Sequence, residues 1–168
     1  MQYLVKRILL VVVLFSVLIA CEKEEELSNI SLPEEDALIN YTTIELELLN
    51  LVNNHRNELG LTRLNRIGLI SKEAENHSNY MAFNDLVSHD NFDIRAKNLY
   101  QNLGIVNVGE NVAYGYLTAN GLMKAWLASS DHRIIIENEN FTYFGVSAKL
   151  NTSGRYYFTL ILVECEPN

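Results

Sequence analysis

The C-terminal part of the sequence restricts the fold most, because two of its segments have the periodicity of β-strands. From residue 144 to residue 150, Phe, Val, Ala and Leu alternate with Gly, Ser and Lys, as in a strand with one buried face. The turn residues Asn151-Thr152-Ser153-Gly154 follow, and residues 156–163 are apolar on both faces apart from Thr159. A strand of this kind must be covered on both sides, so the sequence predicts a hairpin whose second strand is central in a sheet.

Helical patterns earlier in the chain can supply the covering layers. Thr42-Thr43-Ile44-Glu45 has the residues of a capping box, and apolar residues then recur at helical spacing until Gly60. We also expect helices at about 70–87, at 92–103 and after Thr118, and a strand at 106–114 interrupted by Gly109. Helices on both faces of a sheet indicate the α+β class, with a three-layer α-β-α sandwich.

The first residues indicate export. Lys6 and Arg7 precede an apolar run at 8–20, which at about 1.5 Å per residue spans roughly 20 Å, less than a bilayer core of about 30 Å. The run ends at Cys21, in an order that resembles a bacterial lipoprotein signal with acylation of that cysteine. We expect a signal peptide at 1–20, a lipid-anchored tether at 21–41 and a folded domain at 42–168; the alternative is an uncleaved signal anchor.

Most of the negative charge lies in the expected tether. The chain has a formal net charge of −8, and residues 22–36 contain seven acidic residues and one Lys. This balance argues against sequence-independent binding of nucleic acid phosphates. The run Glu22-Lys23-Glu24-Glu25-Glu26 resembles a surface-export signal of some Gram-negative lipoproteins. The expected location is therefore the bacterial cell envelope, anchored to the outer membrane and facing outward.

The polar residues that could carry chemistry are dispersed along the chain. His89, Glu110 and His132 each lie beside small or turn-forming residues, and no compact metal-hydrolase, phosphate-loop or serine-nucleophile motif is found in the sequence. Only the fold could bring the three together. The alternative interpretation is two loop histidines and a buried carboxylate with a structural role.

Several motifs, taken in order, resemble the CAP superfamily, also called the SCP domain (cysteine-rich secretory proteins, antigen 5 and plant pathogenesis-related proteins). The resemblance is to the bacterial branch and covers about residues 44–165. The motifs are Leu51-Val52-Asn53-Asn54-His55-Arg56, Ser88-His89, Gly109-Glu110-Asn111, Trp126 with Ser129, His132-Arg133 and Gly145-Val146.

The resemblance implies an α-β-α sandwich with a cleft in which His89, His132 and Glu110 form a metal site for Zn²⁺ or another divalent cation. Two imidazoles and a carboxylate suit zinc and leave a position open. Glu110 is then a ligand, an acceptor that holds a histidine tautomer, or a base on bound water. The residues expected around the site are Ser88, Asn111, Trp126, Ser129, Asp131 and Arg133. Ser129 stands where animal and plant members have a second Glu.

Three functions remain open. The first is a lipid-anchored binding module whose cleft takes a divalent metal, a small or lipid-like ligand, or a partner protein. The second is a zinc-dependent hydrolase in which Glu110 activates water, and the third is a surface interaction scaffold with a vestigial cleft. Because Ser129 replaces the second Glu, the catalytic set is incomplete and binding by a monomer is the preferred hypothesis.

Overall fold

The computed structural model describes residues 39–165. The expected signal peptide, the acylation site Cys21 and most of the tether lie outside the described residues, so those predictions stand as made. Within residues 39–165, every helix is too short or too polar to cross a bilayer.

In the described part of the chain, four strands form one sheet in the order β1-β3-β4-β2. Strand β1 is Asn65–Arg66, β2 is Ile105–Tyr114, β3 is Tyr143–Leu150 and β4 is Tyr156–Cys165. Strands β3 and β4 form the expected hairpin, β2 is antiparallel to β4, and β1 is parallel to the start of β3. The apolar strand β4 is therefore central, as its sequence predicts.

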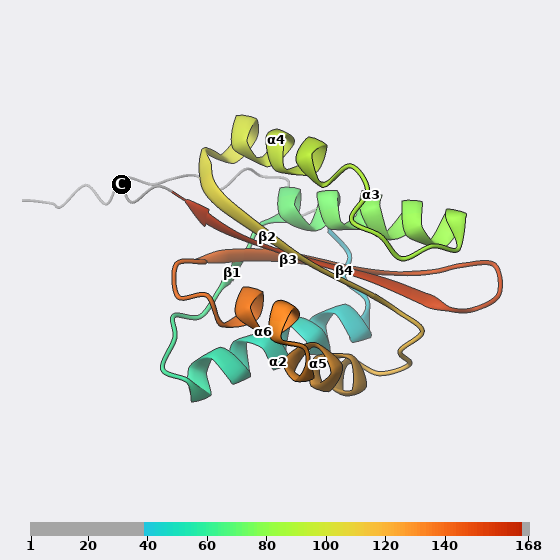
Figure 1. Ribbon diagram of the computed structural model, residues 1–168, viewed down its shortest axis with the longest axis horizontal. Helices are drawn as coiled ribbons and strands as arrows, with labels where there is room; N and C mark the ends of the chain where they lie inside the picture. The colour runs from blue at the N-terminus through green and yellow to red at the C-terminus, as the bar shows by residue number, and fades with distance from the viewer. Residues whose placement is uncertain (1–38, 166–168) are drawn as a thin grey trace, which may run out of the picture. The chain divides into compact units, whose positions relative to one another are not determined.

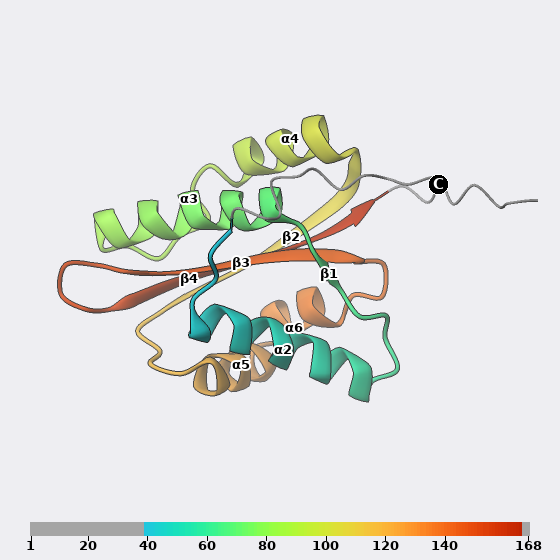
Figure 2. The same ribbon diagram turned by 180° about the vertical axis from the view of Figure 1, so that it is seen from behind.

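Within residues 39–165, five helices cover the sheet on both faces, which confirms the α-β-α sandwich (Figure 1). Helices α3 (Gly68–Asn84) and α4 (Phe92–Leu103) lie on one face. Helices α2 (Thr43–Glu58), α5 (Ala119–Ala128) and α6 (Ser130–Glu137) lie on the other, and the reverse view shows the same layers (Figure 2).

Alternate residues of β4 build the two halves of the core. Leu160 and Leu162 pack in the cluster that contains Trp126 of α5, whereas Ile161 and Val163 pack in the cluster that contains Leu99 of α4. All four β4 side chains are fully buried. Burial on both faces explains why residues 156–163 show no polar face.

Helix α3 approaches β3 closely at Gly145. A Cβ atom on Gly145 would lie 2.3 Å from the backbone nitrogen of Ser71 and 2.5 Å from the carbonyl carbon of Ile70. Only a residue without a side chain allows the two backbones to come so near. This contact fixes α3, and with it the loop that follows α3, relative to the sheet.

The structure corrects several local expectations. Helix α3 begins at Gly68 and ends at Asn84, three residues before the expected end, because Asp85 takes a left-handed conformation (φ 49°). Gly109 does not interrupt β2 but pairs with Leu162 within it. Its missing side chain instead leaves room for α6, since a Cβ would lie 2.9 Å from Ile135. Helix α6 and strand β1 were not expected from the sequence.

Candidate functional site

Glu110 lies near the middle of β2 and is held by two partners. Its side chain is almost fully buried. Arg95 donates from Nε to Oε2 and from Nη2 to Oε1, both at 2.8 Å, and His89 Nδ1 donates to Oε1 at 2.8 Å. A carboxylate that receives a two-point guanidinium contact is fixed in orientation as well as charge. Glu110 therefore anchors both neighbours from inside the protein.

The turn before α4 brings Arg95 and His89 to this carboxylate. Asn91 precedes the helix in a left-handed conformation with φ 58°, and Arg95 lies in the first turns of α4. Arg95 Nη1 donates to the carbonyl of Asp90 at 2.7 Å, so one guanidinium holds both the loop and Glu110. The ring of His89 projects from this loop with 54% of its side chain exposed. Because Nδ1 is bound to Glu110, Nε2 is the nitrogen left for other contacts.

His77 of α3 holds the loop that carries His89. Its Nε2 donates to the carbonyl of Ser88 at 2.7 Å and lies 4.0 Å from Glu110 Oε1. Burial lowers the pKa of His77, which outweighs the opposing effects of the Ser88 carbonyl and the Glu110 charge. A neutral His77 thus fixes the residue next to His89, and its own side chain is buried.

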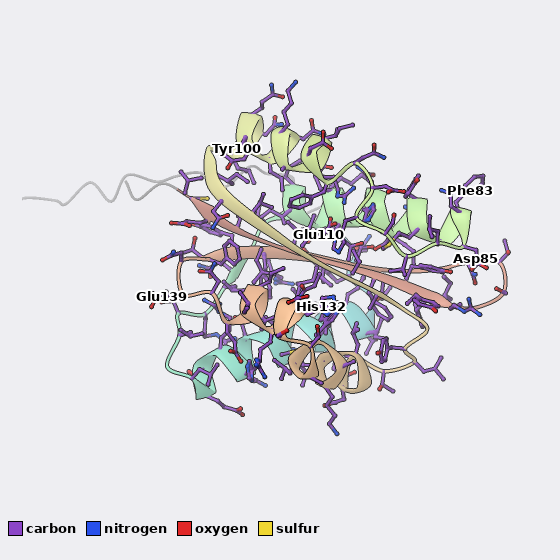
Figure 3. The ribbon with its side chains drawn as sticks, viewed as in Figure 1. Phe83, Asp85, Tyr100, Glu110, His132 and Glu139 are labelled. Carbon is purple, nitrogen blue, oxygen red and sulfur yellow. The ribbon has the colours of Figure 1, made fainter. Side chains whose placement is uncertain are left out.

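His132 comes from the opposite helical layer. Figure 3 shows Glu110 on the side of the sheet where α3 and α4 lie, with His132 on α6 across β2. Asn111 of β2 donates from Nδ2 to the carbonyl of His132 at 3.0 Å, which ties α6 to the sheet. Burial and the nearby His89 both lower the pKa of His132, against a smaller opposing effect of Asp131. His132 is therefore a neutral imidazole near neutral pH.

Helix α6 is also fixed to α2 at its C-terminal end. The buried guanidinium of Arg56 donates from Nη1 to the carbonyls of Ile136 and Asn138 at 2.8 Å and from Nη2 to that of Phe141 at 3.1 Å. A cation at the C-terminal carbonyls of a helix is favourable because it opposes the helix dipole. His55 Nε2 adds a contact of 2.8 Å with Glu137. These contacts set the position of the helix that carries His132.

The two histidines line one cleft with an apolar floor. Its volume is about 480 Å³, and its walls come from the loop before α4, from β2 and from α5 and α6. The other lining residues are Val87, Ser88, Val112, Ala113, Tyr114, Tyr116, Ala125, Trp126 and Ser129. A second hollow of about 410 Å³ is lined by both His89 and Glu110, so His89 borders both hollows. A cleft of this size that is mostly apolar with a few polar groups has the properties of a small-ligand site.

The sequence-predicted metal set is assembled only in part. His89 and His132 share the cleft, whereas Glu110 lines the neighbouring hollow and is bound to Arg95. No group of three or more His, Cys, Asp or Glu side chains within residues 39–165 is placed to hold an ion. Of the three roles left open for Glu110, its contacts favour that of holding a histidine tautomer.

The residues expected around the site have separate roles. Trp126 is a buried core residue whose Nε1 donates to the carbonyl of Val112 at 3.3 Å, and Ser129 lines the cleft between α5 and α6. Asp131 and Arg133 are exposed. Asn111 holds α6 to the sheet through its side-chain amide.

Arg95 is the residue that sequence reasoning did not place. Arg95 lies fifteen residues before Glu110, and nothing in this spacing identifies Glu110 as its partner. The helix pattern at 92–103 carries one usable signal, since Arg95 lies four residues before the buried Leu99 and thus on the same helix face.

Comparison with known proteins gives a consistent result. The model of the cysteine-rich secretory protein family (CAP) matches residues 49–162. An uncharacterised membrane protein of Bacillus subtilis, YlbC, is 29% identical over 121 residues, which is 70% of this chain and 34% of the relative. The uncharacterised protein YkwD of the same organism is 32% identical over 105 residues, or 61% of this chain and 41% of the relative. The chain thus matches less than half the length of either relative.

Solved structures share the fold at low sequence identity. An outer surface protein of Borrelia burgdorferi superposes with a TM-score of 0.68 at 19% identity, covering 76% of this chain and 97% of that one. The structure of NaASP2 with Zn²⁺ superposes with a TM-score of 0.54 at 13% identity, covering 80% of this chain and 82% of that one. The family match spans most of the described domain, and the chain belongs to the cysteine-rich secretory protein (CAP) family.

Proposed function

We propose that this protein is a binding protein of the bacterial cell envelope whose cleft takes a divalent cation through His89 and His132. The observation that carries the proposal is the 2.8 Å hydrogen bond from His89 Nδ1 to Glu110 in a cleft that His132 also lines. A carboxylate only accepts, so it fixes the tautomer of His89 with its proton on Nδ1. The lone pair of Nε2 is then available to a metal, in an arrangement that is common in metal sites.

The chemistry of the donor set fits a weak site. Two imidazoles are good ligands for zinc, and burial keeps His132 in the neutral form that binds metals. Two protein ligands leave several positions open, whereas zinc sites that are closed by protein use four ligands. When bound, the ion would supply a Lewis-acidic position for an oxygen or nitrogen atom of a ligand. The apolar floor of the cleft suits a small or lipid-like ligand body.

The contacts of Glu110 do not favour the hydrolase hypothesis. A general base must lie within hydrogen-bond distance of the atom whose proton it takes, at most about 3.2 Å between heavy atoms, directly or through one water. Glu110 is buried, lies outside the lining of the cleft that contains both histidines, and its two oxygens receive donors from Arg95 and His89. A binding function needs no base, so it is the function that this geometry supports best.

The proposed location rests on the order of the N-terminal residues. A basic start, a short apolar run and Cys21 support anchoring by acylation of this cysteine, and several acyl chains give firm attachment. The likeness in fold to an outer surface protein is consistent with an outward-facing domain. Labelling cells with a radioactive fatty acid tests the anchor: the wild type should take up label and Cys21→Ala should not.

Zinc titration by calorimetry tests the binding proposal. The full chain in detergent should bind about one equivalent, and His89→Ala and His132→Ala should each weaken binding at least about tenfold, since each removes one of two ligands. His55→Gln is the matched control, because His55 is not in the cleft lining and a Gln side chain can still donate a hydrogen bond to Glu137. Absence of binding by the folded wild type, or equal weakening by His55→Gln, would overturn the proposal.

A further inference from the structure

Strand β2 is an edge strand of the sheet. It pairs with β4 on one side, and within residues 39–165 no strand pairs with its other side. Figure 1 looks onto this free edge, which crosses in front of β4 and β3, between the layer of α3 and α4 and the layer of α5 and α6. Proteins usually close such edges with charged residues, proline or a covering segment. Strand β2 has no proline, and its one charged residue, Glu110, is paired with Arg95.

The hydrogen-bond register shows which backbone groups of β2 face the free edge. Gly115 N donates to the carbonyl of Tyr156, and in an antiparallel ladder the residues that bond to the partner strand alternate with residues that do not. Counting back from Gly115, every second residue bonds to β4. The residues between them turn their N–H and C=O groups outward, and these are Val108, Glu110, Val112 and Tyr114.

Side chains of this protein take only part of the free edge. Val108 N donates to Asn107 Oδ1 at 2.9 Å, and the carbonyl of Val112 accepts from Trp126 Nε1 at 3.3 Å. In the part of the chain that the structure describes, no partner is found for Val112 N or for the N–H and C=O groups of Glu110 and Tyr114. Glu110 and Val112 are buried, and unpaired backbone groups at buried residues are rare in native proteins.

The cleft and the second hollow both run along this edge. The second hollow touches residues 107–110 of β2, and the cleft touches residues 112–114. Successive side chains of a strand point to opposite faces, so a hollow that touches successive residues lies beside the strand and not over one face. Because β4 occupies the inner side of β2, both hollows lie at the free edge. We call them together the β2 groove, which at roughly 3.3 Å per residue is about 26 Å long.

The walls of the β2 groove are mostly apolar and come from both helical layers. Phe92 lies on the α4 side, and Ile134 and Trp126 lie on the side of α5 and α6. Apart from the two histidines, the only acidic or basic residue in the lining is Glu110, and its charge is balanced by Arg95. This charge balance favours an uncharged partner with apolar side chains.

We propose that the β2 groove binds an extended, uncharged peptide segment of another protein, which adds to the sheet as a strand beside β2. Its main chain hydrogen-bonds to the open groups of Glu110, Val112 and Tyr114, and its apolar side chains enter the two hollows. The hollows are centred about four residues apart along β2, which matches side chains at positions i and i+4 on one face of a strand. Binding needs no cation, so it is independent of the metal proposed for His89 and His132.

Nuclear magnetic resonance with an uncharged heptapeptide tests the proposal. The probe is acetyl-Thr-Leu-Thr-Ser-Thr-Leu-Thr-amide, whose leucines are four residues apart. A chelator is present, so the result does not depend on zinc binding. In the nitrogen-15-labelled full chain, the probe should shift the amide protons of Glu110, Val112 and Tyr114 downfield in a saturable manner. The amides between them, which are already bonded to β4, should shift less.

N-methylation of the probe shows whether its main chain pairs with β2. Methyl groups on the amides of positions 2, 4 and 6 block one edge of the peptide, and methyl groups at positions 3 and 5 block the other. One of these two peptides should bind at least about tenfold more weakly than the unmodified probe, because it loses main-chain hydrogen bonds. The other should keep its affinity. Equal affinity of all three peptides would overturn strand pairing.

Tyr114→Pro removes one outward donor of β2 and leaves the bonds to β4 in place, so it should weaken binding of the probe about tenfold. Leu150→Pro is the matched control. Since Asn151 N bonds to the carbonyl of Arg155, the amide of Leu150 also points away from β4, but on the opposite edge of the sheet. It should leave the affinity unchanged, and thermal unfolding shows whether both variants are folded.

Three results would overturn the proposal. The first is a folded wild type without saturable shifts at Glu110, Val112 and Tyr114. The second is binding of the probe by Tyr114→Pro with the affinity of Leu150→Pro. The third is a dimer in sedimentation experiments without peptide, with the same three amides shifting as the protein concentration rises, which would assign the edge to a second copy of this chain.

Discussion

Arg95 and Glu110 form a two-point ion pair in the interior, with Nε and Nη2 of the arginine each 2.8 Å from one carboxylate oxygen. Both side chains are buried. The pair connects α4 to β2, and Oε1 also accepts a hydrogen bond from His89. One buried ion pair thus determines where an exposed imidazole lies in the cleft.

Removing one member of this pair should be costly. Arg95→Met leaves the Glu110 carboxylate buried without its guanidinium, and we expect the free energy of unfolding to fall by about 3–5 kcal/mol in urea denaturation. The double variant Arg95→Met/Glu110→Gln should recover part of this loss, because no buried charge remains. Arg133→Met, at an exposed arginine, is the control and should change stability by at most about 0.5 kcal/mol. A loss in Arg95→Met no larger than in the control would contradict the assignment.

Stability should fall as the pH drops below about 6.5. Burial lowers the pKa of His77 and of His132 in the folded state, so the unfolded chain binds protons at these residues first as the pH falls. Their contribution is complete above the ordinary histidine pKa of 6.5 and is lost as the pH falls through the folded-state values. Urea midpoints measured from about pH 7.5 to about pH 5 check this. His77→Gln, which cannot titrate, should flatten the slope; an unchanged slope would show that His77 does not contribute.

The close contact between α3 and β3 predicts a large effect at Gly145. The added Cβ of Gly145→Ala would meet backbone atoms of Ile70 and Ser71, which cannot move without shifting α3, and we expect a loss of about 3 kcal/mol or more. Gly154→Ala is the matched control. Its Cβ meets nothing within 4 Å, and only its φ of +78° opposes the change, so the expected loss is about 1 kcal/mol. Equal losses in thermal or urea unfolding would show that the contact at Gly145 is not tight.

Local patterns in the sequence predicted most of the fold. The alternation at 144–150 and the apolar run at 156–163 correspond to β3 and β4, and residues 92–103 form α4 with the expected bounds. Helix α6 was missed because its first residues, Ser130-Asp131-His132-Arg133, are polar, and because Ile134-Ile135-Ile136 lack helical periodicity. This helix depends on contacts with α2, such as those of Arg56, which no local pattern encodes.

The candidate site was predictable only as a set of residues. The family resemblance pointed to His89, Glu110 and His132. The structure brings His89 into contact with Glu110 and into one cleft with His132. The sequence could not show that Arg95 pairs with the Glu110 carboxylate. Nor could it show that Glu110 and His132 come from opposite faces of the sheet. Both facts depend on which strand residues face which helical layer, and that follows from the complete packing of the sandwich.

The most direct test of the account is the nitrogen-15 spectrum of the histidine rings in the full chain during a zinc titration. The account predicts that His89 carries its proton on Nδ1 before zinc is added. Zinc should then shift the Nε2 signal of His89 together with a ring nitrogen of His132, whereas His77, whose Nε2 is bound to Ser88, should not respond. Zinc-dependent shifts at His77 or His55 in place of His89 and His132, or no shift in a folded protein, would contradict it.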